Sequence, residues 1–207
     1  YTVDVNWLTD NAVSVPRIDI DIEGGKSVTS KTVYLDANFR ITGYGVYENF
    51  EDSVQIKGRG NSTWRKSKKP FLLRLSDKAG LLNMGEDSDW VLLANTSDES
   101  NLHNKLIFDM ANRACKEWTP QCEFVDLYLN GQYNGLYLLA EKIESGKNRL
   151  DIDVGAGDFL CSVDFSVRTE TLENPFCTES GRTIAVCEPN ILSDEAKKRI
   201  MDLVNQQ

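Results

Sequence analysis

The amino-acid sequence predicts an α+β fold, built mainly from an antiparallel sheet with a packed central helix and a C-terminal helix. Apolar and polar residues alternate in several short segments of the first half, as is typical of half-buried strands. An apolar stripe with helical spacing follows, and a hairpin signal comes directly after it. Two tight antiparallel strands directly after a helix favour α+β over alternating strand and helix units.

The clearest early strand is expected at residues 15–22, where Ile18, Ile20 and Ile22 alternate with polar side chains. A Gly-Gly pair then predicts a turn at residues 23–26. Short apolar segments bounded by polar clusters indicate further strands. These are expected at residues 32–35, 39–42, 53–57, 71–75 and 89–95.

The central helix is expected to begin near residue 100. Thr96 and Glu99 have capping-box spacing, and Asp98 and Ser100 are alternative caps. An apolar stripe recurs every three to four residues, which predicts that the helix packs on another element. The stripe consists of Leu102, Leu106, Ile107, Met110, Ala111 and Ala114.

A hairpin is predicted around Asn130-Gly131, a pair suited to positive φ angles. Its strands are expected at residues 125–129 and 135–140. Two more strands are expected at residues 159–164 and 183–187, and a final amphipathic helix at residues 193–204. Residues 1–14 are expected to form an N-terminal extension, and residues 15–207 a single domain.

Composition excludes several classes of protein. The 207 residues contain 32 Asp and Glu against 23 Lys and Arg, and this acidic balance disfavours a nucleic-acid partner. No run of about 18 apolar residues exists, so no transmembrane segment is expected. His103 is the only histidine, which excludes a multi-histidine metal site and makes most hydrolase chemistry unsuitable. A surface or capping role is the expectation for His103.

The five cysteines are an odd set without a Cys-x-x-Cys pair, which argues against a zinc ribbon or a redox motif. Two states of the cysteines fit the sequence: a disulfide such as Cys115 to Cys122, or buried free thiols.

Charge is distributed unevenly along the chain. Residues 57–78 contain eight of the 23 cationic residues and one acid, so this segment carries +7 and the remainder −16. A local cationic segment in an acidic protein is a candidate anion site. Within it, Gly58 and Gly60 could bring backbone N–H groups close to a ligand, with Asn61 and Ser62 adding polar side chains. A phosphate cradle and a solvated basic hairpin both fit this spacing.

Six segments follow one another in a characteristic order: residues 56–64, 68–71, 89–95, 104–106, 128–137 and 141–149. Their order and spacing closely resemble the CotH kinase family, named for a spore coat protein. The resemblance runs from about residue 15 to the C-terminus. It implies an atypical kinase, in which an N-terminal and a C-terminal lobe enclose ATP and Mg²⁺ and the acceptor is a Ser of a coat protein.

The resemblance further implies that this chain is the N-terminal lobe and contributes the phosphate-cradling half of the ATP site. No residue is assigned to Mg²⁺ or to catalysis, because the downstream aspartate segment of the family is missing, and the chain alone is expected to transfer no phosphate. Arg74 stands where members usually carry Lys, and Glu141 is a candidate for the connection between lobes. The residues expected to bind the nucleotide are Lys57, Arg59, Asn61, Ser62, Lys69, Arg74 and Glu141.

The expected partners are therefore a nucleotide and a Ser-containing protein substrate, and the expected location is secreted or at the cell surface, with the cytoplasm of a spore-forming cell as the alternative. A competing hypothesis is a cell-surface module that binds proteins or glycans without catalysis.

Overall fold

The computed structural model describes residues 14–115, 117–164, 175–178, 181, 183–189 and 193–205. The chain divides into two units, Tyr1–Lys142 and Ile143–Gln207. Each unit has its own sheet and its own apolar core.

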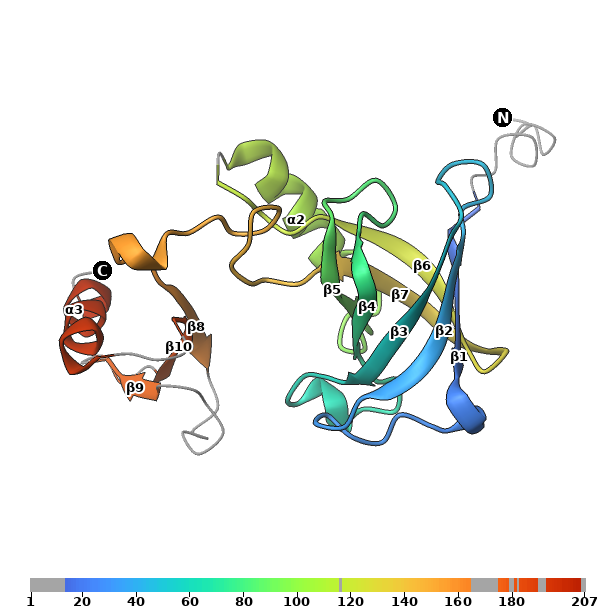
Figure 1. The fold of residues 1–207 in the computed structure, drawn as a ribbon, viewed down its shortest axis with the longest axis horizontal. Helices are drawn as coiled ribbons and strands as arrows, with labels where there is room; N and C mark the ends of the chain where they lie inside the picture. The colour runs from blue at the N-terminus through green and yellow to red at the C-terminus, as the bar shows by residue number, and fades with distance from the viewer. Residues whose placement is uncertain are drawn as a thin grey trace. The chain divides into compact units, whose positions relative to one another are not determined.

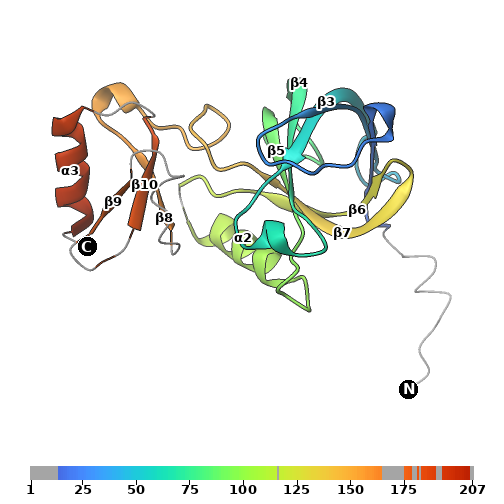
Figure 2. The same cartoon turned by 90° about the horizontal axis from the view of Figure 1, so that it is seen from below.

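Seven strands of the first unit form a closed barrel (Figures 1 and 2). Around the barrel the order is β1-β2-β3-β4-β5-β7-β6. Neighbouring strands are antiparallel, except that β1 and β6 pair in parallel and so close the barrel. The strands are β1 (Arg17–Ile22), β2 (Leu35–Thr42), β3 (Phe50–Gly58), β4 (Phe71–Ala79), β5 (Asp87–Leu93), β6 (Cys122–Leu129) and β7 (Gln132–Glu141).

Alternation along each strand explains the core, because successive side chains point to opposite faces of a sheet. In β1 the isoleucines point inward and are at most 5% exposed, as the period-two pattern predicts. Trp90 and Leu92 of β5 fill the same interior, where both are fully buried. In place of the two strands predicted at residues 32–35 and 39–42, the chain forms one strand, β2, which begins at Leu35, so residues 32–34 lie outside it.

The predicted fold class is wrong. The strands of the first unit close into a barrel, and the described residues contain only two α-helices, each of twelve residues. The closing pairs join Ile18 to Leu127 and Ile20 to Leu129. Partners separated by more than a hundred residues leave no local pattern in the sequence, so the alternation predicted a sheet but not its closure.

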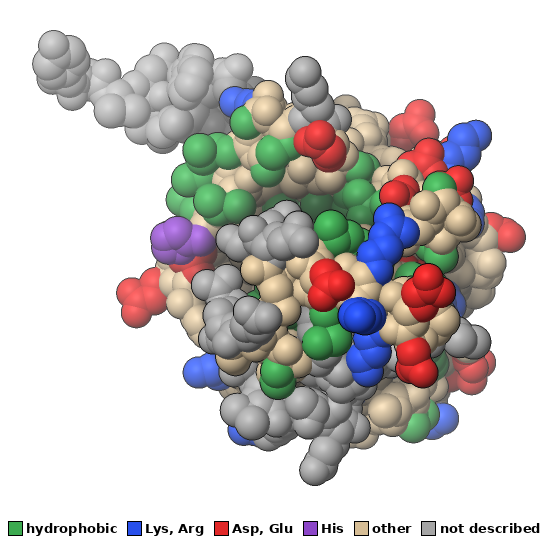
Figure 3. All heavy atoms as spheres, turned by 90° about the vertical axis from the view of Figure 1, so that its left-hand side faces the viewer, with side chains coloured by type: hydrophobic (Ala, Val, Ile, Leu, Met, Phe, Trp, Pro, Cys, Tyr) green, Lys and Arg blue, Asp and Glu red, His purple; other side chains and the backbone are tan. Residues whose placement is uncertain are grey.

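The central helix is α2 (His103–Ala114), and the expectation that it packs through its apolar stripe is also wrong. None of its residues is buried. Leu106, Ile107 and Met110 are each more than half exposed. In Figure 3, apolar side chains lie on the surface beside His103, the only purple side chain.

Another face of α2 meets the barrel. Phe108 packs against an apolar cluster on the outside of the sheet that includes Val91 and Leu138. On either side of it, Lys105 reaches Glu123 at 3.3 Å, and Asn112 Nδ2 donates to the carbonyl oxygen of Pro120 at 3.0 Å. The aromatic ring and these polar bonds orient the helix, so its aliphatic stripe is left in solvent.

The N-cap residue of α2 is Leu102, without a side-chain cap bond, but the predicted alternative caps Asp98 and Ser100 bind N–H groups at the start of the helix. Asp98 accepts a hydrogen bond from the His103 backbone N–H at 2.9 Å, and Ser100 Oγ accepts one from the Leu102 N–H at 3.1 Å. Bonds from Ser100 and His103 lower the pKa of Asp98 to about 2. His103 is exposed, and its Nδ1 lies 2.8 Å from Asp98, which confirms the surface role of the two that were expected.

The hairpin between β6 and β7 is confirmed. Asn130 and Gly131 form its turn with φ angles of 49° and 75°, a conformation that glycine and asparagine tolerate best. The Asn130 side chain also reaches the far end of β1. Its Oδ1 accepts from the Ile22 N–H at 2.8 Å, and its Nδ2 donates to the Lys26 carbonyl at 3.0 Å. The turn of one hairpin thus fastens the strand that closes the barrel.

The second unit contains a three-stranded sheet of order β8-β10-β9 and the helix α3 (Asp194–Asn205). Its apolar core includes Ile184, Val186 and Ile200. The strands are β8 (Leu160–Asp164), β9 (Pro175–Cys177) and β10 (Thr183–Glu188). The predicted elements at residues 159–164, 183–187 and 193–204 match β8, β10 and α3 to within one residue.

All five cysteines are free thiols, so the Cys115 to Cys122 disulfide is not formed. Cys122 lies under α2, and burial raises the pKa of its thiol to about 12. No described helix has the length and apolar character needed to span a bilayer.

Replacing Asn130 with glycine should destabilise the barrel. Glycine keeps the positive φ and removes both side-chain bonds, so the free energy of unfolding should fall by about 1–3 kcal/mol. Urea unfolding followed by tryptophan fluorescence measures this change. Asn83→Gly is the matched control, because Asn83 also has a positive φ and its exposed side chain makes no hydrogen bond in the described part of the chain. Equal midpoints for the two variants would contradict the fastening role.

The orientation of α2 can be tested with two alanine variants. Phe108→Ala should lower the free energy of unfolding by about 2 kcal/mol, less than a fully buried phenylalanine because Phe108 is only partly buried. Leu106→Ala should change it by no more than about 0.5 kcal/mol, because the side chain is in solvent. Thermal unfolding of both variants gives the comparison, and a larger loss for Leu106→Ala would show that the stripe is the packed face.

Candidate functional site

The Gly-rich loop (residues 59–70) connects β3 to β4 and contains the short 3-10 helix η2 (Thr63–Arg65). Its shape requires two glycines. A Cβ at Gly58, the last residue of β3, would lie 2.3 Å from the Trp64 ring. Gly60 has a φ of 84°, and a Cβ there would lie 2.3 Å from the Thr63 hydroxyl. The loop therefore folds tightly on itself, and its own packing demands the glycines that suggested a cradle.

Two lysines bind carbonyl oxygens of this loop. Lys31 Nζ donates to Gly60 at 3.1 Å, and Lys69 Nζ donates to Trp64 at 2.9 Å. In a trans peptide the carbonyl and the next N–H point in opposite directions. Because the Gly60 carbonyl faces Lys31, the N–H of Asn61 points away from that lysine and is left available to a ligand.

Backbone donors are concentrated in the first half of the loop. Within the part of the chain that the structure describes, the N–H groups of Gly60, Asn61, Ser62 and Thr63 donate to no acceptor. The Arg59 guanidinium is partly buried, and it too has no hydrogen-bond or ion-pair partner there. Burial lowers the pKa of Arg59. A desolvated cation beside four unpaired N–H groups favours an anionic ligand.

Lys57 and Arg74 lie on the outer face of the barrel and share one aromatic ring. Lys57 Nζ is 4.4 Å from the centroid of Tyr34, and the Arg74 guanidinium carbon is 5.0 Å from it. Arg74 also binds both oxygens of Asp89 at 2.8 and 3.0 Å, and Lys142 binds the same carboxylate at 2.8 Å. Burial would raise the pKa of Asp89, but these two cations outweigh it and hold the pKa below its usual range. The charge of Arg74 is thus balanced by a neighbour.

The other two predicted site residues make internal contacts. Lys69 gives its ammonium to carbonyls of the loop, as described above. Glu141 is 2% exposed, and its two oxygens accept from the N–H groups of Gly85 and Gln121 at 3.0 and 2.9 Å. Both therefore support the backbone around them, and their contact with a nucleotide stays a prediction.

Of the predicted site residues, Arg59, Asn61 and Ser62 lie in the Gly-rich loop with Lys69, and their contact with a nucleotide stays a prediction. Sequence reasoning missed Lys31 and Tyr34, which lie in the preceding connection, where no motif marks them. Lys68 was counted in the cationic segment and in the segment 68–71, but it was not named as a site residue.

A Mg²⁺ site does not emerge from these residues. Among the described residues, no group of three or more His, Cys, Asp or Glu side chains could hold a metal ion. The neighbouring carboxylates of Asp153 and Asp158, which are of the type that binds Mg²⁺, accept hydrogen bonds from the backbone of their own turn. We therefore derive no metal-dependent step from this chain.

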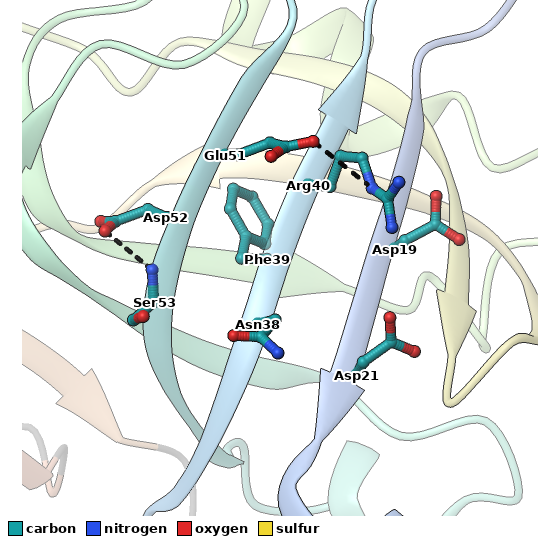
Figure 4. A pocket seen from close by; sticks show the side chains of 8 residues that line it. All are labelled: Asp19, Asp21, Asn38, Phe39, Arg40, Glu51, Asp52 and Ser53. Atoms are coloured by element: carbon teal, nitrogen blue, oxygen red, sulfur yellow. Dashed lines mark hydrogen bonds and ion pairs between the residues drawn. The ribbon is translucent and has the colours of Figure 1, made fainter.

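A polar cavity of about 480 Å³ lies on the outside of β1, β2 and β3 (Figure 4). Its lining carries four carboxylates and one arginine, so it is net negative and does not suit a phosphate. Asp19 pairs with Arg17 outside the cavity at 2.5 Å, and Arg40 lies 3.8 Å from Glu51. None of the predicted nucleotide-binding residues lines it. An adjacent cavity of about 510 Å³ includes Arg74 in its wall.

Replacing Glu141 with glutamine should destabilise the first unit without any ligand present. The amide presents a donor to either the Gly85 or the Gln121 N–H, so the free energy of unfolding should fall by about 1–3 kcal/mol. The control is Glu99→Gln, an exposed carboxylate. Thermal unfolding of the two variants measures the difference in stability. If both variants melt like the wild type, the Glu141 carboxylate has no supporting role.

The sequence profile of the family described as CotH kinase protein matches residues 56–206. No curated protein matches the chain. The matched region starts within β3, and it contains the whole Gly-rich loop and extends into α3. Because the match covers well over half of the sequence, the chain belongs to the CotH kinase family.

Proposed function

We propose that the Gly-rich loop binds the phosphates of ATP and that this chain contributes the phosphate-cradling half of a site for phosphorylation of Ser in a protein substrate. The observation that carries the proposal is the run of four unpaired N–H groups beside the partnerless Arg59. Family membership supports the nucleotide and the protein acceptor.

The chemistry of phosphate matches these donors. Phosphate oxygens accept hydrogen bonds from consecutive backbone N–H groups, which form a concave anion site. A guanidinium can donate two parallel bonds to phosphate. Phosphoryl transfer depends mainly on positioning and on stabilising charge, and both tasks suit Arg59 and the loop backbone. The exposed side chains of Asn61 and Ser62 add further donors at the same place.

The cations around the loop have different roles. Lys31 and Lys69 hold its carbonyls, so they shape the site and keep the local potential positive. Arg59 is available for direct contact. Lys57, near the end of β3, lies against the Tyr34 ring and precedes the loop in sequence.

Replacing Arg59 with alanine should weaken ATP binding. Loss of a charge-assisted bidentate contact should raise the Kd by about ten- to a hundredfold. Titration with a fluorescent ATP analogue, with and without Mg²⁺, measures the Kd. Arg65→Ala is the matched control, because Arg65 is an exposed arginine of the same loop and makes the same change in net charge.

Equal losses in the two variants would show that only the overall charge of the loop matters. Absence of saturable binding to the wild type at millimolar ATP would overturn the proposal. That result would favour the alternative, a module that binds proteins or glycans without catalysis.

A further inference from the structure

Lys68 lies in the Gly-rich loop but points away from the loop's unpaired donors. Its Nζ donates to the carbonyl oxygen of Ala94 at 2.9 Å and to that of Leu136. Ala94 directly follows β5, and Leu136 lies within the neighbouring strand β7. The last backbone pair between β5 and β7 joins Leu93 to Leu138. The ammonium therefore bridges the two strands just beyond the point where their own pairing ends.

The Lys68 side chain passes close to a glycine. Gly135 has a φ of 112°, and a Cβ there would lie 3.3 Å from Lys68 Cε. The pairing of β6 with β7 shifts register at this point, since Leu127 pairs with Gly135 while Tyr128 pairs with Tyr133. This irregularity is a bulge, which re-aims backbone groups. It opens room for the lysine stem on β7.

Tyr137 holds the next residue of the loop. Its hydroxyl donates to the Lys69 carbonyl oxygen at 2.8 Å and accepts from Asn134 Nδ2 at 2.7 Å. The Tyr137 ring also lies 4.4 Å from Lys68 Nζ, a cation–π distance. Burial lowers the pKa of Lys68, in agreement with an ammonium enclosed by carbonyls and a ring.

We propose that Lys68 is a positioning residue, which anchors the Gly-rich loop to the barrel by bridging the carbonyls of Ala94 and Leu136. The effect of this anchor on phosphate binding rests on the proposed function. An anchored loop presents its N–H groups in the bound arrangement and loses less conformational entropy when phosphate binds. Lys68 acts through the loop backbone, because its own ammonium is already satisfied by the barrel.

The test compares Lys68→Met with Lys66→Met. Methionine keeps an apolar stem and removes the ammonium in both, and Lys66 is an exposed lysine of the same loop. Hydrogen exchange is followed at the Arg59 and Arg65 amides, which donate to the carbonyls of Pro70 and Ser62. We expect exchange at both amides to be about tenfold faster in Lys68→Met and unchanged in Lys66→Met. Without the two bonds of the Lys68 ammonium, local opening of the loop costs less free energy.

ATP affinity is measured in parallel and should fall further in Lys68→Met than in Lys66→Met. Exchange at Arg59 and Arg65 that is the same in both variants would overturn the anchor. Faster exchange in Lys68→Met together with no ATP binding by the wild type would support the anchor and remove the proposed function, because the exchange experiment uses no nucleotide.

Should Lys68→Met fail to fold, Tyr137→Phe provides the second variant. It removes the hydroxyl that donates to the Lys69 carbonyl, the one bond of Tyr137 to the loop, and that also accepts from Asn134 Nδ2. We expect exchange at Arg59 to accelerate about threefold, in keeping with the loss of one neutral hydrogen bond. Exchange at the wild-type rate in this variant would overturn the proposal.

Discussion

The parallel pairing of β1 with β6 is the constraint on which the first unit depends. It joins the first and last strands of the order around the sheet, so the sheet has no open edge between them. Closure gives each of the seven strands an inner and an outer face, so the apolar half of every alternation meets in one core. Asn130 reinforces the closure, since its side chain ties the β6–β7 turn to the end of β1.

Closure also determines where the polar chemistry lies. Once the interior is filled with apolar side chains, charged groups remain at the outer face and in the connections. On the outer face, Arg74 and Lys142 converge on Asp89. In the Gly-rich loop, Lys31 and Lys69 bind carbonyls. Several cations of this region thus hold backbone or a carboxylate, whereas the Arg59 guanidinium and a short run of N–H groups have no partner in the described part of the chain.

The strands and turns were largely predictable, because each depends on local spacing. Alternation located β1, and the Asn130-Gly131 pair located the hairpin. The helix shows where such reasoning fails. Its position followed from its spacing, but the choice of face followed from Phe108 and from a polar bond to Glu123 in the next strand, β6. The candidate site divides in the same way: its loop was visible as a motif, whereas the role of Glu141 depends on backbone groups 56 and 20 residues away.

The sequence alone was sufficient for the family, the positions of nearly all strands and both helices, and the loop around Gly58 and Gly60. These features are recorded in short-range order and spacing. Only the tertiary structure decided that the sheet closes, which face of α2 is packed, and which cations are already paired. Those outcomes depend on contacts between residues tens to more than a hundred positions apart, such as Ile18 with Leu127 and Lys68 with Leu136, and no local pattern encodes them.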